Sequence, residues 1–299
     1  MSNDQIPADD RPVSVVTGAN SGIGRATAIH LAARGHRVIG TVRSVERADK
    51  LRNMAADAAV DVELYELDVA DDESVRAGFE QILDATGRVD HLVNNAGVGG
   101  NAVAEECPPE LYLSVMNVNL CGAVRCIQAV LPQMRERGSG TIVNITSVAG
   151  RIAALAQSPY VASKWAFEGL SEGLAQELAP FGIRVAIIEP GVTKSAIFAK
   201  NVDAPNSTEA YDTQYRRMFQ MYAAGIPQAT DPFVVADVIL GAITADTPRL
   251  RYAVGWGSPE MIAGRAAMTD DDWVAMGIHE DDADYIAAFR DKLGVDIST

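Results

Sequence analysis

The sequence predicts an α/β protein: a doubly wound parallel sheet of about seven strands, with helices on both faces, in a single domain. Short runs rich in valine and isoleucine alternate with amphipathic stretches over about the first 190 residues. The first run leads into a glycine-rich turn that is followed by a helical pattern. We find no internal repeat or low-complexity linker in the 299 residues, and a hydrophobic content of 48% is enough for one large core.

The predicted strands are rich in β-branched residues and end in small or polar residues. They span residues 12–18, 36–42, 60–69, 89–97, 140–147, 183–191 and 250–255. Helical patterns lie between them, at residues 22–34, 45–58, 72–86, 108–136 and 158–179. Strands that alternate with helices run parallel in one sheet, so residues 12–257 are expected to form one domain.

Three segments lie outside this alternation. Residues 1–11 are polar and acidic and are predicted to be a disordered tail. Residues 192–230 follow the sixth strand and carry several tyrosines and methionines, which predicts a lid over a pocket; a packed pair of surface helices is the alternative. Residues 258–299 are predicted to be a helical extension, because their acidic clusters suit the first turns of helices; a metal site is the alternative.

Composition excludes several classes of protein. A net charge of −15 argues against binding to nucleic acid, which needs clustered Lys and Arg. A continuous run of about 18 apolar residues does not occur, so no membrane-spanning helix is expected. Cys107, Cys121 and Cys126 form no C-x-x-C pair, so neither a metal site nor a disulfide framework is expected. Because the sequence begins without the pattern of a secretion signal, we expect a cytoplasmic protein.

The first strand runs into TGANSGIG, residues 17–24. Gly18, Gly22 and Gly24 would let the backbone approach a pyrophosphate that lies at the N-terminus of the following helix. The spacing is neither G-x-G-x-x-G nor that of a P-loop, and a simple tight turn is the alternative interpretation. Its place between a first strand and an opening helix favours a dinucleotide site.

Tyr160 and Lys164 stand four residues apart in SPYVASKWA, so they share one face of the predicted helix 158–179. A nearby ammonium favours phenolate. Two unit charges about 4 Å apart, at an effective dielectric constant of about 20, interact by roughly 4 kcal/mol, which is about three pKa units. We therefore expect Lys164 to lower the pKa of Tyr160 from about 10 toward 7, which suits a general acid/base. A contact on a helix surface is the alternative.

The motifs together resemble the short-chain dehydrogenase/reductase family over about residues 12–255. They occur in the order and at the spacings of that family, including thirteen residues between its serine and its tyrosine. The matches are Thr17 to Gly24 for the glycine motif, Asn94 to Gly97 for N-N-A-G, Asn119, Ser147, Tyr160 with Lys164, and Pro190 with Gly191, followed by Thr193.

The resemblance implies a Rossmann-type fold and a hydride transfer between a nicotinamide cofactor and an alcohol or ketone. It implies that Tyr160 exchanges the proton, Ser147 orients the substrate oxygen, Lys164 binds the nicotinamide ribose, and Asn119 holds a water for proton relay. The residues expected to contact the cofactor are Thr17, Gly18, Ser21, Gly22, Ile23, Gly24, Arg43, Asp68, Val69, Asn95, Ala96, Gly97, Tyr160, Lys164, Pro190, Gly191, Val192 and Thr193.

Cofactor, substrate and assembly are predicted from further residues. An NAD-specific site has a carboxylate at the end of the second strand, but no Asp or Glu occurs from Val38 to Val45. Arg43 stands there instead and suits a 2′-phosphate. NADP is therefore expected in preference to NAD. The pocket would be lined by residues near Val98 and Val148, which predicts a hydrophobic alcohol or ketone, for example a steroid. The apolar helices 108–136 and 158–179 predict a homodimer or homotetramer.

Two other functions are alternatives. A serine hydrolase needs a nucleophile, a base and an orienting group, but G-x-S-x-G does not occur, and His36 and His91 adjoin strand starts. A non-catalytic dinucleotide-binding sensor on the same fold is the other alternative, since fold does not fix function. The presence of Ser147, Tyr160 and Lys164 together favours an enzyme.

Overall fold

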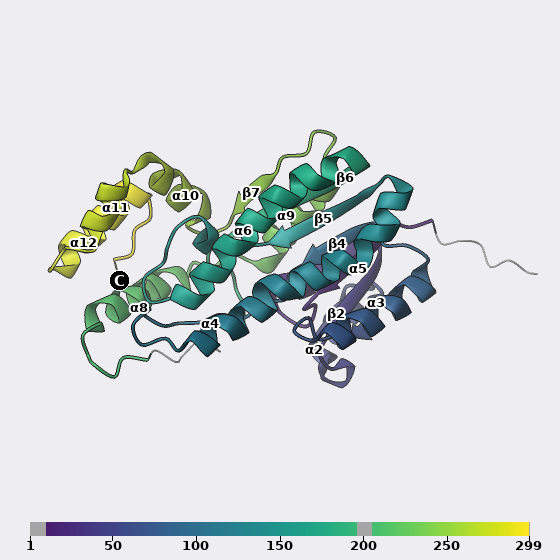
Figure 1. Ribbon diagram of the computed structural model, residues 1–299, viewed down its shortest axis with the longest axis horizontal. Helices are drawn as coiled ribbons and strands as arrows, with labels where there is room; N and C mark the ends of the chain where they lie inside the picture. Colours follow the sequence, from purple (N-terminus) through teal and green to yellow (C-terminus); the bar gives the residue numbers. More distant parts are fainter. Residues whose placement is uncertain (1–9, 196–204, 299) are drawn as a thin grey trace, which may run out of the picture.

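A seven-stranded parallel sheet forms the centre of the computed structural model, which describes residues 10–195 and 205–298 (Figure 1). The strand order is β3-β2-β1-β4-β5-β6-β7. The order reverses between β1 and β4, and ligands bind beside such a reversal at the carboxyl ends of the strands. The predicted fold class is confirmed. The strands are β1 (Val13–Thr17), β2 (Arg37–Val42), β3 (Glu63–Glu66), β4 (His91–Asn94), β5 (Gly140–Ile145), β6 (Ile183–Pro190) and β7 (Arg251–Val254).

Helices cover both faces of the sheet. One face carries α1 (Gly22–Ala33), α2 (Asp49–Asp57) and α9 (Pro232–Thr244). The other face carries α3 (Asp72–Thr86), α5 (Gly122–Arg137) and α6 (Ser158–Leu178). Successive side chains of a strand point to opposite faces, so Val15 joins one core cluster and Val16 joins the other. Because both faces are buried, the strands read as continuous apolar runs rather than as alternating patterns.

Several predicted elements are shorter in the structure, among them the strand expected over residues 89–97, which is reduced to β4. The strand expected over residues 60–69 is reduced to β3, because this edge strand pairs only with β2 and only over four residues. The helix expected over residues 45–58 is divided into a 3₁₀ turn, η1 (Val45–Arg47), and α2.

The pattern over residues 108–136 becomes one continuous helix, Pro109–Arg137, made of α4 (Pro109–Met116), a π-helical turn η2 (Asn117–Cys121) and α5. Its best 18-residue window has a mean hydropathy of 1.3, so by length and composition it could cross a membrane. The expectation that no such stretch exists is therefore not supported. The same composition is found in core helices, and α5 packs on β4 and β5 beside α3.

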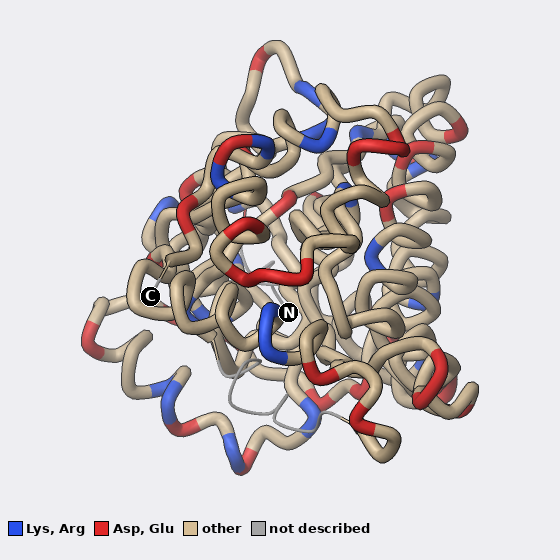
Figure 2. The backbone as a smooth tube through the Cα atoms, turned by 90° about the vertical axis from the view of Figure 1, so that its left-hand side faces the viewer, with Lys and Arg blue, Asp and Glu red and all other residues tan. Residues whose placement is uncertain are grey.

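The last part of the chain builds a separate helical layer at one end of the sheet, at the left of Figure 1. It contains α10 (Ser258–Ala267), α11 (Asp270–Met276) and α12 (Asp282–Leu293), and α8 (Asp212–Gly225) lies against it. In Figure 2, which looks at this end, basic residues are interspersed with acidic ones. The expected lid at 192–230 includes residues 196–204, and the expected tail includes residues 1–9; both of these stretches lie outside the described residues.

Candidate active site

The glycine turn forms a tight cradle at the start of α1. Gly18 and Gly22 have φ values of +65° and +51°, which favour glycine. A Cβ added to Gly24 would lie 2.3 Å from Asn95 Nδ2 and 2.6 Å from the Gly18 carbonyl oxygen, so only glycine fits. Ser21 begins the helix without capping it through its side chain, and the first turn contains no acidic residue. These uncapped N–H groups suit a phosphate, so the cradle fits the pyrophosphate of a dinucleotide.

Thr17 fastens this cradle to β4 rather than facing a ligand. Its Oγ1 accepts hydrogen bonds from the backbone N–H groups of Asn95 and Ala96, each at 3.0 Å. Asn95 Nδ2 in turn donates to the Thr17 carbonyl oxygen at 2.9 Å. Thr17 is 1% exposed, and through these bonds it holds the loop that carries the glycines.

The predicted catalytic residues meet where the end of β5 faces the first turns of α6. Ser147 follows β5, and its Oγ accepts a hydrogen bond from the Ala149 backbone N–H at 3.1 Å, which leaves its own proton for donation to Tyr160. Tyr160 hydrogen-bonds with Ser147. The ammonium of Lys164 lies 5.7 Å from the centroid of the Tyr160 ring. The structure therefore brings together three residues that the sequence separates by up to seventeen positions.

Burial dominates the ionisation of this pair. Burial raises the pKa of Tyr160, and the hydrogen bond with Ser147 offsets only part of that rise. Burial also lowers the pKa of Lys164 to about 8, against the attraction of the Glu168 carboxylate. The expectation that Lys164 lowers the pKa of Tyr160 toward 7 is wrong for the structure as it stands, because both groups are desolvated.

Asn119 lies in the π-helical turn and is 1% exposed. Its Oδ1 accepts from the Val98 N–H at 2.8 Å, and its Nδ2 donates to the Val98 carbonyl oxygen and to Ser163 Oγ, both at 2.9 Å. Asn119 therefore joins the loop after β4 to the helix that carries Tyr160. π-Helical turns inside α-helices frequently mark functional sites.

The other predicted cofactor contacts lie at the carboxyl ends of strands. Ile23, in the first turn of α1, packs against the core. Asp68 lies just beyond β3, and its Oδ1 accepts a hydrogen bond from the Ala70 N–H at 3.0 Å. Gly191 directly follows β6, where an added Cβ would lie 2.0 Å from the Trp256 carbonyl oxygen. The remaining members of this set occupy the same edge of the sheet: Val69 after β3, Gly97 after β4, Pro190 at the end of β6, and Val192 and Thr193 beyond it.

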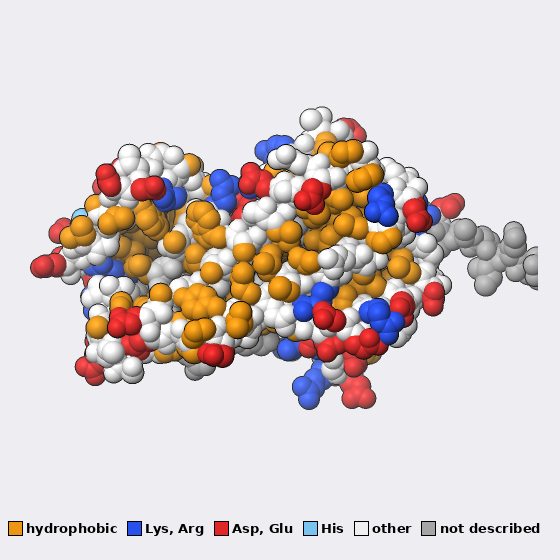
Figure 3. Space-filling view, viewed as in Figure 1, with side chains coloured by type: hydrophobic (Ala, Val, Ile, Leu, Met, Phe, Trp, Pro, Cys, Tyr) orange, Lys and Arg blue, Asp and Glu red, His pale blue; other side chains and the backbone are white. Residues whose placement is uncertain are grey.

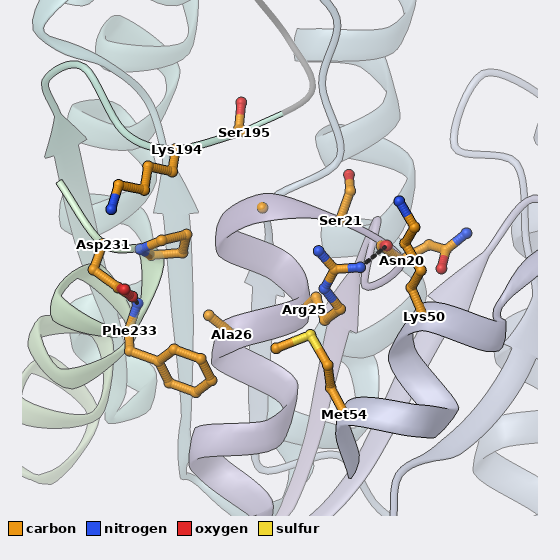
Figure 4. Close-up of a pocket in the computed structure, with 12 residues that line it drawn as sticks. Asn20, Ser21, Arg25, Ala26, Lys50, Met54, Lys194, Ser195, Asp231 and Phe233 are labelled. Carbon is orange, nitrogen blue, oxygen red and sulfur yellow. Dashed lines mark hydrogen bonds between the residues drawn. The ribbon is translucent and has the colours of Figure 1, made fainter. Parts of the chain in front are cut away.

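A cavity of about 370 Å³ lies beside the first turn of α1 (Figure 4). Arg25 and Lys50 approach it from the side of Ser21, and Lys194 lies across the helix from them. Sequence reasoning missed these three cations because their positions match no motif. Arg43 is exposed, does not line this cavity, and forms no salt bridge within residues 10–195 and 205–298.

Two clusters of buried apolar and aromatic side chains pack close to Ser147 and Tyr160. One buried cluster joins Val103 and Ala156 to Tyr215, Met218 and Tyr222 of α8. Tyr222 lies close enough to Tyr160 for their charges to interact, and its hydroxyl donates to Asn101 Oδ1 at 3.2 Å. A second cluster joins Val148 and Ile152, just after Ser147, to the C-terminal helices. Asn101 and the C-terminal helices gave no signal in the sequence that pointed to this site.

Known proteins resemble this chain in sequence and in fold. A family model described as short chain dehydrogenase matches residues 12–206. Human 17-beta-hydroxysteroid dehydrogenase type 1 is 37% identical over 254 residues, which cover 81% of this chain and 77% of that protein. A solved short-chain dehydrogenase from Streptomyces avermitilis has a TM-score of 0.78 at 37% identity and covers 91% of this chain and 99% of its own. A metagenomic short-chain oxidoreductase in complex with NADP has a TM-score of 0.65 at 29% identity, with coverages of 81% and 96%.

The fold, the glycine cradle and these similarities together define an NAD(P)-dependent oxidoreductase that acts on alcohols or ketones. The chain belongs to the short-chain dehydrogenase family.

Proposed function

We propose that this enzyme transfers a hydride between NADP(H) and a secondary alcohol or ketone held in an apolar pocket, with Tyr160 as the general acid/base. The observation that carries the proposal is the convergence of Ser147, Tyr160 and Lys164 at the end of β5, beside the glycine cradle.

Each residue has a separate task. In oxidation Tyr160 takes the proton from the alcohol, and in reduction it returns the proton to the carbonyl oxygen. Ser147 donates its hydroxyl proton to the same oxygen, in place of its hydrogen bond with Tyr160, and so orients the substrate. Lys164 would contact the nicotinamide ribose, and its charge would partly offset the effect of burial on Tyr160, while Asn119 would hold a water that connects Lys164 to solvent. When bound, the cofactor supplies the hydride donor or acceptor, and its oxidised ring adds positive charge.

An apolar substrate, steroid-like in size and character, is supported by three observations. Buried apolar and aromatic side chains pack close to the site, with Tyr215, Met218 and Tyr222 in one cluster and Val148 in another. Figure 3 shows hydrophobic side chains gathered between α8 and the C-terminal helices, at the left of the view. A relative 37% identical to this chain is named a 17-beta-hydroxysteroid dehydrogenase.

Preference for NADP is supported by the cations near the start of α1. Arg43 follows β2 and is exposed, so its guanidinium is available to a 2′-phosphate. Asn20 and Ser21 carry no charge, but Arg25 and Lys50 lie beside them in the cavity of Figure 4. These two residues supply positive charge where the glycine motif itself supplies none.

A homodimer or homotetramer is supported by an apolar surface over α4, α5 and α6, which runs across the centre of Figure 3. Leu113 is 70% exposed and Trp165 is 50% exposed in this region. Contiguous exposed apolar surface of this kind marks an interaction site. We also propose a cytoplasmic location, which fits the free thiols of all three cysteines.

The proposed activity is tested with a panel of alcohols and ketones that ranges from short alcohols to steroids, with NADP(H) and NAD(H) in parallel. Turnover is followed at the nicotinamide absorbance. Turnover of apolar members supports the proposal, and turnover confined to small polar members contradicts the apolar pocket. If no member is turned over although NADPH binds, the proposal of Tyr160 chemistry is rejected.

A further inference from the structure

Behind the proposed catalytic pair lies a buried charge network that the mechanism above does not use. Its centre is Glu168 of α6, which is 5% exposed, together with Glu189 of β6, which is 2% exposed. Arg251 Nε lies 3.0 Å from Glu168 Oε2 and 3.6 Å from Glu189 Oε1. Arg151 Nη1 lies 2.9 Å from Glu189 Oε1. Buried carboxylates are rare unless they are paired, and Arg151 and Arg251 are the partners of these two.

Glu168 continues the spacing of the site along α6. Tyr160, Lys164 and Glu168 follow one another at intervals of four residues, so they share one helix face. That face meets three consecutive residues at the end of β5. Tyr160 forms a hydrogen bond with Ser147. Lys164 Nζ donates a hydrogen bond to the Ile145 carbonyl oxygen at 2.9 Å. Glu168 Oε1 accepts one from Thr146 Oγ1 at 2.6 Å.

Lys164 is buried among aromatic rings, and Glu168 is the carboxylate that attracts its ammonium. Lys164 is 6% exposed, and its ammonium lies over the rings of Tyr160 and Phe167, at 5.7 and 5.8 Å from their centroids. A buried ammonium is unstable unless an opposite charge lies nearby. Glu168 is the carboxylate whose attraction opposes the effect of burial on Lys164.

We propose that Glu168 is a positioning residue for the reaction: it keeps the ammonium of Lys164 charged and fixes the strand end that carries Ser147. The proposal rests on the proposed function of Tyr160 and Lys164. The charged and titratable groups that face Glu168 are Lys164 and Glu172 on its own helix, Arg151 after η3 (Val148–Gly150), Glu189 on β6 and Arg251 on β7.

The test is the pH profile of kcat/KM for alcohol oxidation in the E168Q variant. Glutamine keeps the size of the side chain but removes its charge. Without that charge Lys164 loses its proton at lower pH, so phenolate on Tyr160 is less favoured. The acidic limb of the profile therefore moves to higher pH. We expect a shift of about one pH unit and a loss of about tenfold in kcat/KM at pH 7.

A matched control is E172Q. Glu172 lies one turn further along α6, contacts the same Arg251 at 3.4 Å and is 57% exposed. Its removal is expected to leave the profile unchanged. E168D retains the charge and is expected to move the limb back toward the wild-type position, which loss of packing alone would not do.

The outcomes separate this proposal from the one on which it rests. If E168Q has the wild-type pH profile, Glu168 does not act on Lys164 and the inference is overturned. If E168Q does not fold, the pH profile of T146V is measured instead, because this variant removes the hydrogen bond to Glu168. An unchanged acidic limb in T146V then overturns the inference. If Tyr160→Phe retains wild-type turnover, the proposed function fails whatever E168Q does.

Discussion

Lys164 donates a hydrogen bond from Nζ to the carbonyl oxygen of Ile145 at 2.9 Å. This bond holds the ammonium against the last residue of β5, two residues before Ser147, so the helix that carries Tyr160 and the strand end that carries Ser147 are fixed to each other. Enzymes gain rate from groups that are held in place before the reaction begins. The first prediction follows from this arrangement.

Tyr160→Phe keeps the ring and removes the proton-transfer group. We expect kcat to fall at least about 10²-fold, the usual contribution of a general acid/base. Cofactor binding, measured by titration with NADPH, is expected to be retained. Tyr112→Phe is the control, since Tyr112 also presents a hydroxyl, to Ser158 Oγ at 2.8 Å on the same helix. Near wild-type turnover by a pure Tyr160→Phe sample would contradict the mechanism.

Arg43→Ala tests the cofactor preference. Loss of a charge-assisted hydrogen bond to the 2′-phosphate costs roughly 1.5–3 kcal/mol, so KM for NADP(H) is expected to rise about ten- to a hundredfold. KM for NAD(H) is expected to change little. Arg52→Ala, which removes an exposed arginine paired with Asp49 on α2, is the control. If both cofactors are used equally and Arg43→Ala alters neither KM, Arg43 does not bind the phosphate.

His91 is predicted to make the fold sensitive to acid. Its ring lies 5.4 Å from that of His36, and burial lowers the pKa of His91 to about 4 from an ordinary value of 6.5. The unfolded chain therefore takes up a proton on His91 near pH 6.5, whereas the folded chain does so only near pH 4. Between these values the unfolded state binds more protons, so stability falls as the pH falls, by about 3 kcal/mol in total.

Urea unfolding between pH 7.5 and pH 4 measures this effect. In the wild type the midpoint is expected to drop through that window, and in His91→Gln the same drop is expected to be smaller. Asp90 beside it also has a lowered pKa, but its effect falls in a more acidic range, below its ordinary value of 3.8. An identical slope in both proteins between pH 6.5 and pH 4 would exclude His91 as the source.

Assembly is tested at Leu113, which is 70% exposed on α4. We expect the wild-type chain to be a dimer or tetramer at micromolar concentration, and Leu113→Glu to shift it toward a smaller species because a charge would be buried in the interface. Sedimentation velocity measures both. Val274→Glu is the control, since Val274 is 66% exposed but lies on α11, away from that surface. A monomeric wild type would refute the prediction.

The C-terminal helices are predicted to hold the substrate wall through Arg217. This guanidinium is 4.3 Å from the centroid of the Tyr285 ring and contacts Asp282 at 3.0 Å, so α8 and α12 are joined. Asp282→Asn is expected to cost about 1–2 kcal/mol of stability. It is also expected to raise KM for the substrate several-fold with little change in KM for the cofactor. Asp291→Asn, an exposed position on the same helix, is the control, and equal effects of both would contradict a specific link.

The sequence by itself determined the strands and helices, their order along the chain, and the residues at the carboxyl edge of the sheet. Valine- and isoleucine-rich runs identify strands because both faces of this sheet are buried, and the glycines of residues 17–24 identify the turn because no larger side chain fits there. Motif spacing also indicated that Ser147 and Tyr160 meet. These features are local, or repeat along the chain, and so can be read from it.

Only the tertiary structure decided the ionisation of the site and the contacts of distant segments. Burial, not the four-residue spacing, governs Tyr160 and Lys164, because the cost of desolvation depends on which elements pack around a charge. Glu168 contacts Thr146 and Arg251, and Arg217 contacts Asp282. These contacts join residues that lie 22 to 83 positions apart along the chain. No periodicity specifies such pairs, since they exist only once helices and strands have packed.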